Sequence, residues 1–196
     1  MTETKDFFKP EPSAKKLSSV KSWHMVTNQK NCFYMIAAGM LMSPEGFGNK
    51  YYQDNASLFP GYLPVFPNQV PKSTIDYSIS ENTYLLPCIL NLNLVDLSGP
   101  VKVVTGEGKI KDVKFPADVD DSCQLVLVPA PLPIRYLSSI VCQSHEDKIL
   151  CEKDVADFNN VDLSPYPIKV AAGAFKKHKS QVWPPSLGSA QPIVVN

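Results

Sequence analysis

Hydrophobic and polar positions alternate in 90–94, where leucine and asparagine follow one another. A period of two is typical of a strand with one buried face and one polar face, so we expect a strand within 85–95. The run Leu125–Val128 is apolar without interruption, which indicates a strand buried on both faces. Other short apolar stretches predict strands at 23–27, 101–104, 110–115, 140–142 and 168–170. Glycines between 101–104 and 110–115 predict a turn that joins these two strands into a hairpin.

Two segments have the period of an amphipathic helix. The first spans 28–38, where Thr27 or Asn28 can cap the first turn and Gly39 suits a left-handed C-cap. Its apolar positions fall at three- and four-residue spacing: Cys32, Phe33, Met35, Ile36 and Met40. The second helix begins after Ser144, which forms a capping box with Asp147, and runs to about Phe158. Its inward-facing residues are predicted to be Leu150, Cys151, Val155 and Phe158.

Between these elements lies a long segment, 43–84, without clear periodicity. Proline is frequent in it and in the whole chain, with 18 prolines in 196 residues, about twice average usage. We expect an irregular connection that folds over the core or over a ligand cleft, because it is rich in aromatic residues. Those aromatics are Phe47, Tyr51, Tyr52, Phe59, Tyr62 and Phe66.

Together these patterns predict an α+β fold: a single domain with a mainly antiparallel sheet, two principal helices and long Pro-rich loops. The globular domain is expected to span 21–175. Residues 1–20 read as a flexible arm, and residues 176–196 read as a loose C-terminal tail.

The charge of the chain argues against extensive binding to nucleic acid. Its 19 basic residues balance 19 acidic ones, and Arg135 is the only arginine. A protein that binds along a phosphate backbone usually carries a basic excess and arginine forks. We therefore expect at most a local contact with nucleic acid.

The cysteines are expected to be reduced core residues. They are five in number, form no C-x-x-C pair and have no histidine at ligand spacing, so no metal site is predicted. The acidic cluster Asp118, Asp120 and Asp121 is taken as a solvated turn. No apolar run approaches the roughly 18 residues that span a bilayer, so the protein is expected to be cytoplasmic and away from membranes.

His24, at the end of the first predicted strand, is the main candidate for chemistry. A histidine there can bind the hydroxyl groups of a ligand or transfer a proton near neutral pH. The alternative is a half-buried histidine whose nitrogens are satisfied by the backbone. Arg135, in the rigid Pro-rich loop after Leu125–Val128, is a second candidate at the rim of a site, unless it pairs with Asp121 or Glu146.

The stretch 23–42 carries a resemblance to a known family. The pattern His24-Met25-Val26-Thr27, with Asn31, Ile36 and Gly39-Met40-Leu41, resembles the opening of ADP-ribosyltransferase-like proteins. It is most similar to the DNA-modifying toxins of toxin–antitoxin systems. The resemblance implies an NAD-binding fold whose first strand holds the nicotinamide-side ribose and whose later aromatic stacks on nicotinamide.

Applied residue by residue, the resemblance assigns His24 to the ribose contact, with Thr27 and Gly39 supporting the cofactor. Tyr51 or Tyr52 would stack on the cationic nicotinamide. His24, Tyr52 and Arg135 would form the catalytic set, although no late glutamate can be assigned on a core strand. NAD is thus the expected cofactor.

Two hypotheses follow. The first is an ADP-ribosyltransferase-like domain that binds NAD, active or degenerate, in a bacterial toxin or defence setting. The second is a non-catalytic protein-interaction subunit of a larger assembly, which binds its partner through the aromatic segment 43–84 and the termini.

Overall fold

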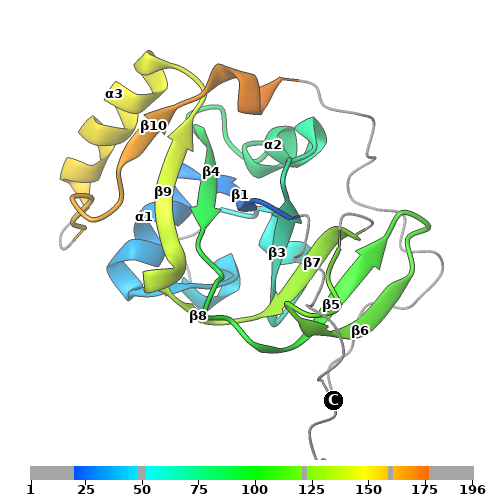
Figure 1. The fold of residues 1–196 in the computed structure, drawn as a ribbon. Helices are drawn as coiled ribbons and strands as arrows, with labels where there is room; N and C mark the ends of the chain where they lie inside the picture. The colour runs from blue at the N-terminus through cyan, green and yellow to red at the C-terminus, as the bar shows by residue number, and fades with distance from the viewer. Residues whose placement is uncertain (1–19, 48–51, 121–122, 159–160, 177–196) are drawn as a thin grey trace, which may run out of the picture.

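The computed structural model describes residues 20–47, 52–120, 123–158 and 161–176. The predicted arm and tail, 1–20 and 176–196, therefore lie almost wholly outside the described residues. The described part forms an eight-stranded sheet in the order β10-β9-β4-β1-β3-β7-β5-β6, in which the β10–β9 pair is parallel and the other pairs are antiparallel (Figure 1). The predicted α+β fold with a mainly antiparallel sheet is confirmed.

The strands of the large sheet are β1 (Trp23–Asn28), β3 (Tyr62–Pro67), β4 (Pro87–Leu92), β5 (Gly99–Thr105), β6 (Ile110–Phe115), β7 (Cys123–Pro129), β9 (Leu137–Cys142) and β10 (Ile168–Val170). A separate two-stranded sheet pairs β2 (Met40–Leu41) with β8 (Leu132–Pro133). The helices are α1 (Gln29–Ala38), α2 (Lys72–Ser78) and α3 (His145–Asp154). Single 3₁₀ turns complete the described elements: η1 (Pro44–Phe47), η2 (Asn55–Leu58), η3 (Ile134–Tyr136), η4 (Val155–Asp157) and η5 (Ala172–Phe175).

Helix α1 begins and ends where its sequence predicts. The side chain of Asn28 accepts a hydrogen bond of 2.9 Å from the backbone N–H of Asn31, which caps the first turn. Gly39 has φ +69°, and its N–H donates to the carbonyl of Ile36 at 3.1 Å. Both predicted caps are thus confirmed.

The segment 43–84 is more regular than its prolines indicate. It contains the central strand β3 and the helix α2, and Phe59 and Phe66 are buried in the core. Pro64 is tolerated because β3 pairs with β7 over residues 62–65 and with β1 only at Phe66 and Pro67. One edge of β3 is unpaired at Pro64, so the missing N–H removes no ladder bond. The prediction of an irregular connection here is wrong.

Helix α3 starts with the predicted capping box, in which Ser144 and Asp147 each accept a hydrogen bond from the other's backbone N–H. It ends at Asp154 and continues into η4, close to the predicted end at Phe158. Cys151 is its one fully buried side chain, whereas Leu150 is 40% exposed. The prediction that Leu150 faces inward is therefore wrong.

The core lies on both faces of the sheet. Met25 packs on one face together with residues of α1 and with Leu90 and Ile140. Val26, the next residue, packs on the opposite face with Phe66 and with Ile75 of α2. Successive side chains of a strand point to opposite faces, so every residue of β1 belongs to one of these two environments.

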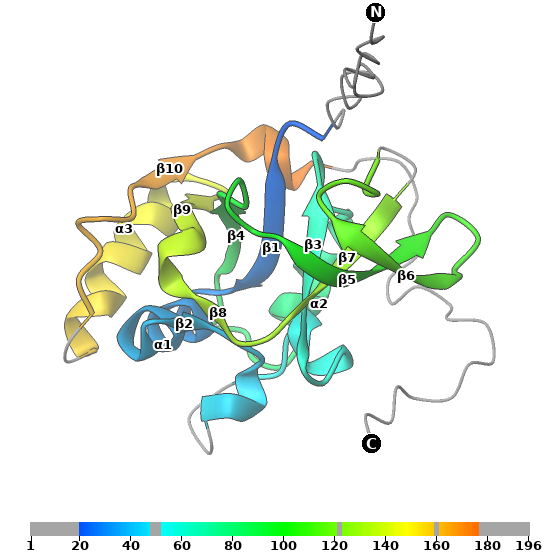
Figure 2. The same ribbon diagram turned by 60° about the horizontal axis from the view of Figure 1, so that its bottom comes forward.

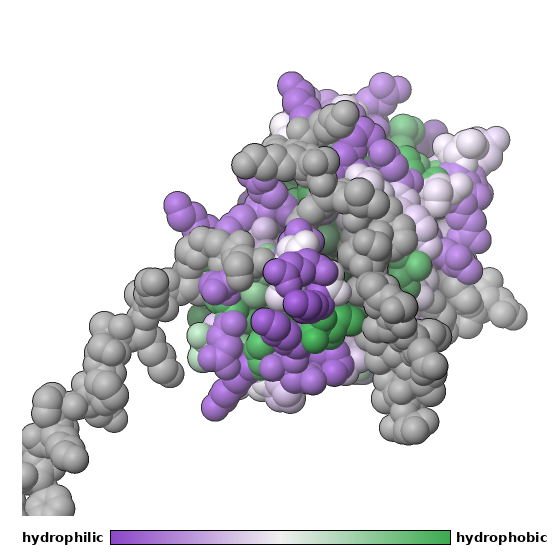
Figure 3. Space-filling model, turned by 90° about the vertical axis from the view of Figure 1, so that its right-hand side faces the viewer, coloured by the Kyte–Doolittle hydropathy of each residue, from purple (hydrophilic) through white to green (hydrophobic). Residues whose placement is uncertain are grey.

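The two ends of the sheet differ in how they are covered. Helix α3 lies beside β9 and β10 at one end, while the β5–β6 hairpin extends at the other end (Figures 1 and 2). Seen from the hairpin side, the coloured surface is mainly hydrophilic, with apolar side chains in separate areas (Figure 3). Within the described residues, no helix is both long enough and apolar enough to cross a membrane.

Candidate ligand-binding cleft

A cleft of about 230 Å³ opens on the face of the sheet that carries Val26. Its walls come from β1, the turn between β3 and α2, β4, β9 and the segment around η5. The lining residues are His24, Asn68, Gln69, Val70, Ile89, Asn91, Val141, Ala171 and Ala174. The floor is apolar, and the polar side chains belong to His24, Asn68, Gln69 and Asn91, which makes the cleft suitable for a small molecule with hydroxyl or amide groups.

A row of hydrogen-bonded polar side chains crosses three neighbouring strands below the cleft. His24 of β1 lies directly opposite Asn91 of β4, and its Nδ1 is 2.8 Å from the Asn91 Oδ1. Asn91 lies opposite Ser139 of β9, and its Nδ2 donates to the Ser139 hydroxyl at 2.9 Å. On the other side, His24 Nε2 is 2.9 Å from the hydroxyl of Ser22.

The hydrogen bonds of this row indicate which ring nitrogen of His24 carries the hydrogen. The amide nitrogen of Asn91 is used as a donor to Ser139, so its oxygen must accept from His24. The Nδ1 of His24 therefore carries the hydrogen, and in the neutral ring Nε2 accepts from the Ser22 hydroxyl. Both ring nitrogens of His24 are engaged within the protein, so neither is free for proton transfer.

Burial lowers the pKa of His24 below its ordinary value of 6.5, while the hydrogen bond to Asn91 and a backbone interaction with Asn68 oppose the shift. The neutral imidazole is thus the form that the fold favours at neutral pH. A neutral ring next to an apolar floor suits a flat or hydroxyl-bearing part of a ligand.

Asn68 shapes the rim of the cleft at the end of β3. It has φ +62°, a left-handed conformation that asparagine tolerates better than most residues. Its Oδ1 accepts from the backbone N–H of Lys21 at 2.7 Å, and its own N–H donates to the carbonyl of Ser22 at 2.8 Å. Asn68 therefore fixes the approach to β1 and holds Ser22 next to His24.

Thr27 lies on the other face of β1, away from His24. It is fully buried, and its hydroxyl donates to the carboxylate of Asp54. The same carboxylate accepts from the Asn31 amide at 3.0 Å and from the backbone N–H of Ala56 at 2.8 Å. The structure therefore does not bring Thr27 into the cleft with His24, because three residues along a strand reverse the direction of the side chain.

Of the remaining predicted cofactor contacts, Tyr52 and Gly39 are not among the residues that line the cleft. Tyr52 is held through its backbone, which exchanges two hydrogen bonds with the side chain of Asn31 at 2.6 and 3.1 Å. Gly39 ends α1 and is absent from the residues that line the cleft. Tyr51 lies outside the described residues.

Arg135 is exposed on η3, with its guanidinium 5.3 Å from the ring centre of Tyr136. Of the two proposed partners, Asp121 lies outside the described residues and Glu146 forms no ion pair with Arg135. The structure thus supports a stacking role on Tyr136 for Arg135 and does not bring it to His24. Of the five predicted site residues that the structure describes, His24 is the one that lines the cleft.

The cleft also depends on residues that the sequence did not single out. Asn91 belongs to the alternating stretch 90–94. The alternation predicted a strand there, but it did not show which residues of other strands would lie beside Asn91. Asn68 and Gln69 follow β3, in a segment that was predicted to be irregular. A polar pair at a strand end is a recognisable signal, but only after β3 itself has been identified.

Comparison with known structures supports the sequence resemblance. DarT of Thermus sp. 2.9 in complex with NAD+ matches with a TM-score of 0.53 and 12% identity, over 81% of this chain and 98% of that chain. The same protein in complex with ADP-ribosylated ssDNA matches with a TM-score of 0.52 and 12% identity, over 80% and 97% of the two chains. Thermosipho africanus DarTG in complex with ADP-ribose matches with a TM-score of 0.53 and 11% identity, over 79% of this chain and 50% of that chain.

No protein-family model and no curated protein sequence matches the chain. DarT and DarTG are ADP-ribosyltransferase toxins of toxin–antitoxin systems, so the predicted resemblance to such proteins is confirmed. At 11–12% identity the likeness establishes the fold. The chain therefore has an ADP-ribosyltransferase-like fold.

Proposed function

We propose that this domain binds NAD in the cleft beside His24 and does not transfer its ADP-ribose group. The proposal is supported by the fold shared with DarT, which was solved with NAD+, and by the chemistry of the cleft. Asn and Gln side chains offer both donors and acceptors to ribose hydroxyls and to a carboxamide. The apolar floor of Val70, Ile89 and Val141 can contact a flat ring.

The proposal that the domain does not transfer ADP-ribose rests on the composition of the cleft wall. Among the residues that the structure describes, the nine that line the cleft include no carboxylate and no guanidinium. Transfer of ADP-ribose requires groups that stabilise the positive charge developing on the ribose and that activate the acceptor. The described residues around the cleft supply neither, since His24 is neutral and both of its nitrogens are hydrogen-bonded.

The decisive test blocks the cleft without touching its polar residues. Ala171 lies exposed at the rim, so Ala171→Trp is expected to fill the cleft and weaken NAD binding at least tenfold, as measured by isothermal titration calorimetry. Ala172 is also exposed but does not line the cleft, so Ala172→Trp is the matched control and should bind NAD as the wild type does. An NAD affinity that is equal in both variants would overturn the assignment of the cleft.

Two further measurements distinguish the ligand and the chemistry. Titration with ADP-ribose tells whether the nicotinamide half contributes, and release of nicotinamide from NAD measures turnover. We expect binding without release. Release that is lost in Ala171→Trp would show that the cleft is catalytic and would contradict the non-catalytic assignment.

The likeness to DarT also supports a bacterial toxin or defence setting for this domain.

The alternative function, a protein-interaction subunit, draws on a different observation. Ile149 and Leu150 of α3 are 63% and 40% exposed and adjacent, which is an apolar surface that a partner could cover. A well-folded protein with no affinity for NAD or ADP-ribose would favour this alternative.

A further inference from the structure

Cysteines from three separate elements, β4, β9 and α3, come together at helix α3. The Sγ atoms of Cys88, Cys142 and Cys151 all lie within 4.8 Å of one another, and those of Cys142 and Cys151 are 3.8 Å apart. Each of the three residues is at most 1% exposed.

The fold creates this cluster from positions that are distant in the sequence. Strands β4 and β9 pair Ile89 with Val141, so Cys88 and Cys142 come next in register on the face that packs against α1. Cys151 reaches the same place from α3, which follows β9. The sequence contains no pair of cysteines at ligand spacing, and for that reason these residues were expected to be ordinary core side chains.

The arrangement matches the geometry of a thiolate metal site. Zn²⁺ binds sulfur at about 2.3 Å, and tetrahedral geometry then separates two ligand sulfurs by about 3.8 Å. Converging thiols in an environment without oxygen ligands favour a soft cation over Mg²⁺ or Ca²⁺. A disulfide would use only two of the sulfurs and would not explain why a third converges on them.

Metal binding would release the protons of the three thiols to solvent, because the thiolate is the form that binds a metal ion.

We propose that Cys88, Cys142 and Cys151 bind one Zn²⁺ ion as thiolates. The ion would fasten α3 to strands β4 and β9 of the sheet. Helix α3 has a specific need for such a link, because Cys151 is its one fully buried side chain. At its C-terminal end α3 makes polar contacts to α1, where Lys30 and Gln29 contact Asp154 at 3.2 and 3.3 Å. The site is independent of the proposed NAD cleft, which lies on the other face of the sheet.

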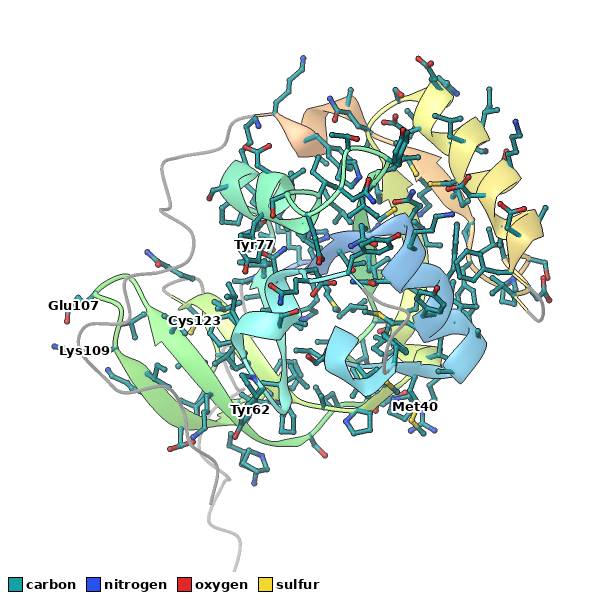
Figure 4. The ribbon with its side chains drawn as sticks, turned by 180° about the vertical axis from the view of Figure 1, so that it is seen from behind. Met40, Tyr62, Tyr77, Glu107, Lys109 and Cys123 are labelled. Carbon is teal, nitrogen blue, oxygen red and sulfur yellow. The ribbon has the colours of Figure 1, made fainter. Side chains whose placement is uncertain are left out.

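The test is a titration of the full-length, reduced protein with Cd²⁺, followed by ultraviolet charge-transfer absorbance, and with Zn²⁺, followed by thermal unfolding. We expect one ion per chain, a raised melting temperature and slower amide hydrogen exchange in α3. Cys151→Ser should abolish the charge-transfer band. Cys123→Ser is the matched control, since Cys123 is a buried thiol on β7 in the part of the molecule away from α3 (Figure 4).

Several outcomes would overturn the site. In the first, the wild-type protein shows no charge-transfer band with Cd²⁺. In the second, the band survives in Cys151→Ser. In the third, the mass of the untreated protein is lower by two hydrogens because a disulfide has formed. If Cys151→Ser does not fold, the wild-type band and the effect of Zn²⁺ on α3 exchange still decide the question.

Discussion

At the scale of single residues, His24 combines a structural role with a place in the cleft. Its two nitrogens are bound by Asn91 and Ser22, and the row continues to Ser139 across three strands. The Ser22 hydroxyl can donate or accept, so the row satisfies the neutral ring and also the protonated ring. His24 is thus half-buried with both nitrogens hydrogen-bonded, mainly to side chains, and its role in ligand binding stays a prediction.

The lowered pKa of His24 predicts a dependence of stability on pH. The unfolded chain takes up a proton on this residue near pH 6.5, whereas the folded chain does so only at lower pH. The unfolded state therefore binds more protons as the pH falls below about 6.5, and stability is lost with a slope of at most about 1.4 kcal/mol per pH unit.

The measurement is urea unfolding of the wild type and of His24→Asn between about pH 7.5 and pH 5.5. The variant is expected to lose less stability over this range than the wild type does. His145→Asn, which removes an exposed histidine outside the cleft, should behave as the wild type. A parallel loss in the wild type and in His24→Asn would refute the shift.

At the scale of elements, local chemistry accounts for where helices begin and end. Asn28 and Ser144 accept backbone hydrogen bonds at the starts of α1 and α3, and Gly39 closes α1 in a left-handed turn. Strand β3 shows the converse, because its two prolines point to a loop and only the pairing with β7 and β1 makes it a strand. Caps are local signals, whereas a strand requires its neighbours.

The left-handed turn at Gly39 gives a prediction for the end of α1. No atom lies within 4 Å of a Cβ placed there, so Gly39→Ala should cost about 1 kcal/mol through backbone conformation alone. Gly173 of η5 has equally open space but no positive φ, so Gly173→Ala should cost nothing measurable or stabilise slightly. Chemical unfolding of both variants checks this, and equal stabilities would contradict the argument.

At the scale of the whole molecule, one buried carboxylate ties three parts of the chain together. Asp54 precedes η2 and accepts hydrogen bonds from Thr27 of β1, from Asn31 of α1 and from the backbone N–H of Ala56. Tyr52 is bound to Asn31 through its backbone on the same side. The resemblance assigned Thr27 to a cofactor, but the structure shows it in this internal network.

Removal of the Asp54 carboxylate leaves several buried donors unsatisfied. Asp54→Ala is therefore expected to destabilise the protein by about 3 kcal/mol. Asp112 is the control, because its ion pair with Lys102 lies on the surface and Asp112→Ala should change stability by less than about 1 kcal/mol. Unfolding in urea measures both variants. A small effect of Asp54→Ala would show that solvent reaches these donors.

The sequence by itself determined the elements whose signals are local. The caps of α1 and α3, the strand around the alternating Asn91 and the doubly buried Leu125–Val128 were all predictable from period and capping chemistry. The resemblance in 23–42 indicated the fold. His24 was singled out because a histidine on a short strand can bind hydroxyl groups or transfer a proton near neutral pH.

Only the tertiary structure decided which residues meet. Strand pairing places His24 opposite Asn91 and separates it from Thr27, and the same register brings Cys88 to Cys142. The order of the strands in a sheet and the face on which each side chain lies depend on contacts between distant segments. Local patterns do not contain that information, so the cleft and the cysteine cluster become visible only in the folded chain.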